Sequence, residues 1–112
     1  MYMVERIQVQ SRSPFEIYHI LNSLEKVPEI TVEAELFLPQ VDGPFGCVIA
    51  LHGSMGWAEH HQDHINIWLR AGLAVCKVNS FSSRSVDNTV DDQLTVTHAM
   101  MIVDAFRIRA VL

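Results

Sequence analysis

The chain has 112 residues, of which 49% are hydrophobic and 19% charged, and its formal net charge is −5. This apolar content excludes a disordered acidic tail, which lacks the apolar surface to offset chain entropy, and the length allows one small domain. The net negative charge, with no cluster of Lys or Arg, argues against nucleic acid as a partner.

The first ten residues contain Glu5 and Arg6 and no apolar core of a secretory signal. No apolar run approaches the roughly 18 residues of a membrane span. Cys47 and Cys76 lie inside apolar runs, which indicates buried thiols in a reducing compartment and not a disulfide framework. We therefore expect a soluble, cytoplasmic protein that does not bind membranes.

Two strands are predicted in the first third of the chain. Val4–Val9 and Thr31–Leu38 alternate apolar and polar residues, as half-buried strands do. Between them, Ser13-Pro14 offers a helix cap and a first-turn proline, so a short helix is expected after it. Pro39 ends the second strand.

The middle of the chain predicts a strand followed by a helix. Cys47–Leu51 is continuously apolar, which favours a strand covered on both faces, as in a parallel sheet. The loop His52–Gly56 follows, and Glu59–Ala71 has helical spacing, with Gly72 as its C-terminal cap.

The last third repeats the same order. Leu73–Val78 predicts a buried strand, Asn79–Asn88 a polar loop, and the apolar residues from Leu94 to Ile108 a long helix. Strand, helix, strand, helix is typical of an α/β fold with a mostly parallel sheet, here preceded by antiparallel N-terminal strands. The apolar stretch Met100–Leu112 has no Gly, Asn or Pro to end it, which favours a chain that is interrupted within a helix.

Functional loops of open parallel sheets lie at the carboxyl ends of strands, which here means His52–Glu59 and Asn79–Asn88. Gly53 and Gly56 let the backbone approach a ligand, and amides that lead into a helix are well disposed to bind developing negative charge. The alternative is a glycine-rich turn that only reverses the chain direction.

An ordered set of segments carries a family resemblance. These are Val32–Leu38, Pro44-Phe45, Leu51–Gly56, Ala71–Val75, Asn79–Phe81, Arg84 and Asp92-Gln93. The set resembles the N-terminal half of the dienelactone hydrolase family of α/β-hydrolases. The resemblance implies a hydrolase fold with flanking helices, a triad of nucleophile, acid and histidine, a small-molecule ester or lactone substrate, and no cofactor.

In that family the loop after the third strand supplies one backbone donor of the oxyanion hole. The resemblance assigns this donor to the amide of Ser54, with the amide of Met55 as the alternative, and it makes His52, Gly53 and Gly56 loop-shaping residues. The Ser54 hydroxyl has no part in this assignment.

The chain departs from the family at the nucleophile, because it contains no Gly-X-Ser-X-Gly or Gly-X-Cys-X-Gly motif. His52 stands where the strained turn needs a small residue, which argues against Ser54 as the nucleophile. The family's acid and histidine follow the nucleophile. We therefore expect residues 1–112 to be a single partial domain that supplies the oxyanion loop of a carboxylic ester hydrolase and is inactive alone.

Other polar residues have two interpretations each. Trp57, Ser80, Phe81 and Arg84 either line a substrate pocket or act structurally, Trp57 as a staple between loop and helix and Arg84 in an ion pair with Asp87 or Asp91. His98 and Asp104 on the last helix are each expected to be either solvated or satisfied in a structural role, and Cys47 and Cys76 are expected to pack in the core. The cluster His60, His61, Asp63 and His64 has some metal-ligand spacing, but a solvated first helical turn is the expected role, and we assign no metal.

Two rival functions remain open. A truncated, inactive hydrolase half is expected to act as a binding module, or to associate with itself through an open sheet edge. A nucleotide-binding βαβ protein has little support, since the chain lacks both Gly-X-Gly-X-X-Gly and the P-loop motif.

Overall fold

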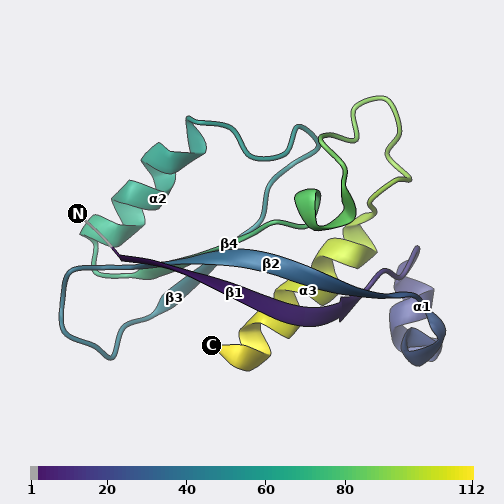
Figure 1. Ribbon diagram of the computed structural model, residues 1–112, viewed down its shortest axis with the longest axis horizontal. Helices are drawn as coiled ribbons and strands as arrows, with labels where there is room; N and C mark the ends of the chain where they lie inside the picture. Colours follow the sequence, from purple (N-terminus) through teal and green to yellow (C-terminus); the bar gives the residue numbers. More distant parts are fainter. Residues whose placement is uncertain (1–2) are drawn as a thin grey trace.

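Four strands form one mixed sheet, and the computed structural model describes residues 3–112 of the chain (Figure 1). In chain order the strands are β1 (Met3–Arg12), β2 (Glu29–Leu38), β3 (Cys47–Ala50) and β4 (Ala74–Val78). They lie in the order β1-β2-β4-β3, with β1–β2 and β2–β4 antiparallel and β3–β4 parallel. The chain is thus an α/β domain with antiparallel N-terminal strands, as predicted.

The expectation of a mostly parallel sheet is wrong for this chain. Only β3 and β4 are joined by a helical crossover, so they form the one parallel pair among the described strands. The strand β2 pairs antiparallel with β1 over ten residues and then also with β4. The long β1–β2 ladder therefore makes the sheet mostly antiparallel.

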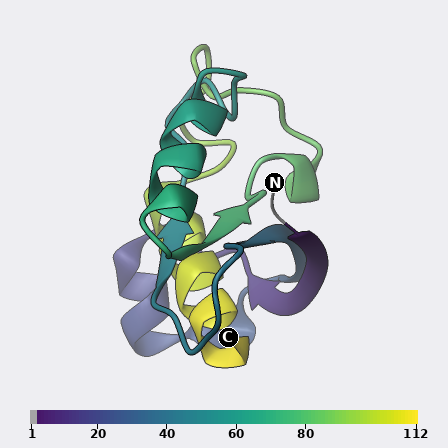
Figure 2. The same cartoon turned by 90° about the vertical axis from the view of Figure 1, so that its left-hand side faces the viewer.

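Each face of the sheet is covered by one long helix, α2 (His61–Arg70) or α3 (His98–Val111) (Figures 1 and 2). Alternation along β4 divides the core: Val75 packs under α2 with Ile65, whereas Cys76 packs under α3 with Ile108. All four side chains are at most 1% exposed. No helix within residues 3–112 is both long and apolar enough to cross a membrane.

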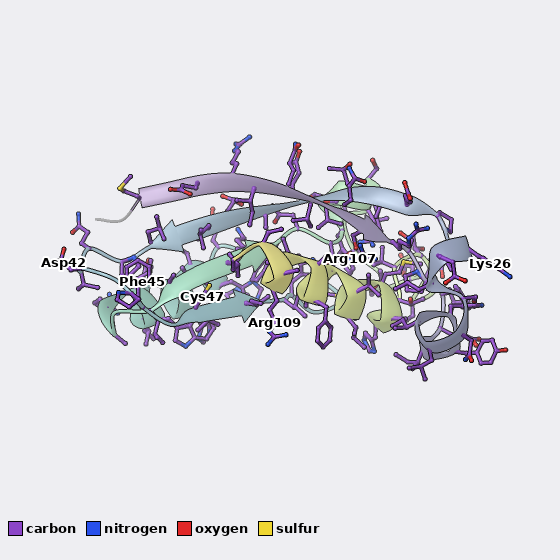
Figure 3. All side chains as sticks on the ribbon, turned by 90° about the horizontal axis from the view of Figure 1, so that it is seen from below. Lys26, Asp42, Phe45, Cys47, Arg107 and Arg109 are labelled. Atoms are coloured by element: carbon purple, nitrogen blue, oxygen red, sulfur yellow. The ribbon has the colours of Figure 1, made fainter. Side chains whose placement is uncertain are left out.

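The first helical segment begins later than expected. The helix α1 spans Ile17–Asn22 and is followed by the short 3-10 helix η1 (Leu24–Lys26). The N-cap of α1 is Glu16 and not Ser13. The amide of Ser13 donates instead to the carbonyl of Pro28 (2.9 Å) and extends the β1–β2 pairing. Figure 3 shows the β2–β3 loop, with Asp42 and Phe45, at the opposite end of the molecule from η1, with Lys26.

The end of α2 confirms the role predicted for Gly72. This residue has a φ of +85°, and its amide donates to Leu69 O (3.0 Å) while the Leu73 amide donates to Trp68 O (3.0 Å). The two bonds form a Schellman motif, which satisfies the last carbonyls of the helix and favours glycine at the left-handed position.

The helix α3 begins at His98, so the prediction that it includes Leu94 is wrong. Thr97 is the N-cap, and its hydroxyl accepts a hydrogen bond from the Met100 amide (3.4 Å). Leu94 instead belongs to a long loop between β4 and α3, where 63% of its surface is exposed.

The two cysteines differ in environment. Cys76 is fully buried, as expected. Cys47 is the first residue of β3 and is exposed, so the prediction that it packs in the core is wrong. The reason is that β3 is an edge strand whose only partner in the described chain is β4. Figure 3 shows Cys47 at this edge, beside α3.

Candidate functional site

The loops that follow β3 and β4 lie side by side at the carboxyl ends of the two parallel strands (Figure 1). The first loop covers residues 51–60 and leads into α2; the second covers residues 79–97, includes the 3-10 helix η2 (Ser82–Arg84) and leads into α3. A hydrogen bond from the Thr89 amide to Ser54 O (2.8 Å) joins them. Both loops singled out from the sequence therefore contribute to one site.

A tight turn at Gly53–Gly56 exposes two backbone donors. The Gly56 amide donates to Gly53 O (3.0 Å), so Ser54 and Met55 are the two central residues of a β-turn. Neither the Ser54 amide nor the Met55 amide donates to any acceptor within residues 3–112. The Met55 side chain is 73% exposed. The turn therefore presents N–H groups that are free to bind a ligand oxygen.

The two glycines of this turn have different physical roles. Gly56 has a φ of +75°, and a Cβ there would lie 2.9 Å from the carbonyl oxygen of Asp87. It is therefore needed for the approach of the second loop, not for the approach of a ligand. A Cβ on Gly53 would meet nothing within 4 Å, so the space beside Gly53 is open.

His52 is buried at the base of the turn and is 7% exposed. Its Nδ1 lies 2.9 Å from Gly53 O, and because a carbonyl only accepts, Nδ1 carries the proton and donates. The ring packs edge-on against Phe81 and Trp57, with centroids 4.2 Å and 5.4 Å away. Burial lowers the pKa of His52, so the neutral imidazole is favoured. These contacts agree with a loop-shaping role.

A cavity of about 330 Å³ opens between the two loops and the start of α3. Ser54, His52, Gly53 and Phe81 line it, whereas Met55, Trp57, Ser80 and Arg84 do not. Among the two amides, the geometry therefore favours Ser54 as the donor to a ligand. The Ser54 hydroxyl is directed to Gln93 Oε1 (3.4 Å).

Several cavity residues were not found from the sequence. They come from the second loop and from α3: Thr89, Gln93, Leu94, Val96, Thr97, His98 and Met101. The position of the second loop at the carboxyl end of β4 indicates that it contributes to a site. The sequence pattern underestimates the length of this loop, because it assigns Leu94 to the helix. His98 has an exposed side chain, in agreement with the solvated role that was one of the two expected for it, and this side chain lies at the cavity wall.

Trp57 joins the first loop to the sheet and to α2. Its indole Nε1 donates to Val78 O (2.9 Å), and its ring contacts His61 edge-on. Lys77 Nζ lies 5.1 Å from the ring centroid, which is within cation–π distance. These contacts correspond to the staple interpretation, and Trp57 does not line the cavity between the two loops.

Arg84 is fully occupied by the protein. It forms a bidentate ion pair with the buried Asp104 of α3 (2.7 Å and 3.0 Å), and its other N–H groups donate to Ser13 Oγ, Ser80 O and Arg12 O. The prediction that Arg84 pairs with Asp87 or Asp91 is therefore wrong. The interpretation of Asp104 as a satisfied structural residue is correct. Arg84 has no donor left for an acidic ligand, since a guanidinium has five N–H groups.

Ser80 and Phe81 follow β4 directly. Phe81 is 4% exposed and lines the cavity, which agrees with the pocket-lining alternative for this residue. Ser80 is fully buried, and its hydroxyl has no hydrogen-bond partner in residues 3–112. Ser80 does not line the cavity.

The histidines His60, His61 and His64 lie at the start of α2. Within residues 3–112 no three His, Cys, Asp or Glu side chains come close enough together to hold a metal ion. His61 instead caps the preceding turn, because its Nδ1 accepts a hydrogen bond from the Ala58 amide (2.9 Å). Desolvation lowers the pKa of His61, with smaller contributions from the neighbouring charges of His60, His64, His52 and Lys77.

Comparison with known proteins gives no relative: no family model, no curated protein and no solved structure matches the chain.

Proposed function

We propose that the chain supplies the oxyanion-binding part of a carboxylic ester or lactone hydrolase of the dienelactone hydrolase type. In this proposal the Ser54 amide donates to the oxygen that becomes negative when the ester carbonyl is attacked. The nucleophile, the acid and the catalytic histidine are supplied by polypeptide other than residues 1–112.

The unpaired Ser54 amide beside a cavity is the observation that supports the proposal most. An unpaired N–H that is exposed to water carries no free-energy penalty, because water accepts its hydrogen bond. In a closed site the same N–H stabilises developing negative charge. Its location on the loop between β3 and the following helix is that of the loop donor in α/β-hydrolases. The antiparallel strands before one parallel β-α-β unit are compatible with the first part of such a fold.

The rest of the loop holds this donor in position. His52 is bonded to Gly53 O, Trp57 is bonded to Val78 O, and the Thr89 amide holds the carbonyl of Ser54. A donor fixed before the reaction needs no reorganisation when charge develops, which is why such groups contribute strongly to catalysis.

A matched pair of variants tests this proposal. Ser54→Pro removes the N–H at the second position of a β-turn, where proline is well accommodated, and Ser54→Ala removes the hydroxyl but keeps the N–H. The probe is butyrate, a carboxylate like the product of ester hydrolysis, and its Kd is measured by ligand-observed NMR. Since hydrogen bonds to charged groups contribute about 1.5–3 kcal/mol, we expect S54P to raise the Kd about 10- to 100-fold and S54A to leave it nearly unchanged.

Two results would contradict the proposal. One is equal binding of butyrate by S54P and wild type, with tryptophan fluorescence showing that both are folded. The other is turnover of p-nitrophenyl acetate by the chain alone that a serine-directed phosphonate abolishes, because that would require a nucleophile within residues 1–112.

The free edge of β3 supports a second candidate function, a binding or self-association module. An edge strand presents unpaired N–H and C=O groups, and an apolar groove of about 260 Å³ lined by Ile49, Leu51 and Trp68 runs beside it. Light scattering over a concentration series tests this: we expect a dimer that Leu51→Lys dissociates. A monomer at all concentrations would contradict it.

A further inference from the structure

Besides the residues of the Ser54 turn, apolar and polar side chains without a fixed charge line the cavity. The apolar residues are Phe81, Leu94, Val96 and Met101, and the polar ones beside them are Thr89, Gln93, Thr97 and His98. Among the described residues, no Asp, Glu, Lys or Arg lines the cavity. A ligand that enters it therefore meets backbone donors at the turn, and elsewhere apolar and neutral polar side chains with no fixed charge.

The cations nearest in sequence are directed to other partners. All five N–H groups of Arg84 donate to protein acceptors, and two of them neutralise the buried Asp104. Lys77 lies over the ring of Trp57, outside the cavity lining. Neither side chain can pair with a second negative group on a ligand.

The histidines do not replace these cations. His52 uses its Nδ1–H on Gly53 O, and burial favours its neutral form. His98 is exposed, so any charge on it is screened by water, and no ion pair of His98 with a described residue is found. The chain as a whole carries a net charge of −5, which further opposes the approach of a dianion.

We propose that the cavity accepts an acyl group that is apolar and carries no second charged group, so that the substrate is a simple aliphatic ester or lactone and not a carboxylate-bearing one. This inference rests on the proposed function. The carbonyl oxygen binds at the Ser54 amide, and the acyl chain packs against Phe81, Val96 and Met101, of which each is at most 8% exposed. A second carboxylate on the chain would lose part of its water in this cavity and gain no cationic partner there.

Butyrate and succinate test the inference, because both are four-carbon acids and succinate carries the additional carboxylate. Both Kd values are measured by ligand-observed NMR at pH 7.5 with wild type, S54P and the control S54A. We expect succinate to bind wild type at least tenfold more weakly than butyrate. His98→Gln is expected to change neither value by more than twofold.

The outcomes separate the inference from the proposed function. If succinate binds as tightly as butyrate and S54P weakens both, the inference is wrong and the oxyanion role stands. Loss of tight succinate binding in H98Q would then identify His98 as the missing cation. If S54P changes the binding of neither ligand, the oxyanion role fails and the inference fails with it.

Discussion

Asp104→Ala is expected to destabilise the chain more than any single surface change, because it leaves a buried arginine without its partner. The Asp104 side chain is fully buried and accepts three hydrogen bonds: one from Ser11 Oγ at 2.6 Å and two from Arg84 at 2.7 Å and 3.0 Å. The Arg84 side chain is itself only 7% exposed. Asp104 therefore joins α3 to Ser11 of β1 through a hydrogen bond and to Arg84, in the loop that forms the cavity, through the ion pair.

The magnitude follows from the burial of the ion pair. Removing one partner of a buried ion pair costs about 3–5 kcal/mol, since an uncompensated charge remains inside. A domain of this size has a free energy of unfolding of about 5–15 kcal/mol, so the loss is a large fraction of it. With a urea m-value of about 1–3 kcal/mol per molar, the midpoint falls by more than about 1 M.

Urea unfolding followed by the fluorescence of Trp57 and Trp68 measures this loss. The matched control is Glu29→Ala, which removes the Arg12–Glu29 ion pair at a side chain that is 68% exposed, and which should cost less than about 1 kcal/mol. A cost for D104A as small as that of the control would refute the reasoning. The double variant Arg84→Met/Asp104→Leu should cost less than the sum of the single changes, because neither charge is left unpaired.

Three further predictions follow from single features. Gly56→Ala should lower the free energy of unfolding by about 1–3 kcal/mol, because a φ of +75° is strained for alanine and the new methyl would lie 2.9 Å from a carbonyl oxygen. An unchanged urea midpoint would contradict this. The pKa values of His52 and His61 are lowered in the folded chain, so as the pH falls below about 6.5 the unfolded chain binds protons before the folded chain does. The free energy of unfolding should therefore fall with the pH, and urea midpoints at about pH 7.5, 6.5 and 5.5 would show this. His61→Gln should reduce the dependence of the midpoint on pH. Iodoacetamide should modify Cys47 in the native protein and Cys76 only after unfolding, because Cys47 is exposed and Cys76 is buried. Burial raises the pKa of both thiols, that of Cys76 to about 12, and mass spectrometry of the alkylated peptides distinguishes the two.

Local patterns were enough to predict most elements. The alternation in Thr31–Leu38, the apolar run from Cys47 and the glycine after α2 depend on neighbours in the chain, and the corresponding strands and helix end are present. Strand pairing depends on residues far apart. The antiparallel contact of β2 with β4 was therefore not predicted, and the sheet was assigned as mostly parallel.

The candidate site was predicted in part for the same reason. The His52–Gly56 turn is local, and its composition indicated a backbone-donor loop. The cavity wall is made by the second loop, whose position depends on the Thr89–Ser54 bond and on the Arg84–Asp104 ion pair. No sequence spacing indicates that Arg84 pairs with Asp104, so an ion pair was predicted for Arg84 but its partner was not, and the position of His98 in the cavity wall was not predicted either.

The amide resonance of Ser54 in a two-dimensional ¹H–¹⁵N NMR titration with butyrate tests the oxyanion role most directly. The account predicts that the Ser54 amide proton moves downfield with saturation, because it gains a charged acceptor, and that S54A shows the same shift at residue 54. The Gly56 and Thr89 amides, which already donate to Gly53 O and Ser54 O, should move much less. A stationary Ser54 resonance, while other cavity residues shift on binding, would contradict the account.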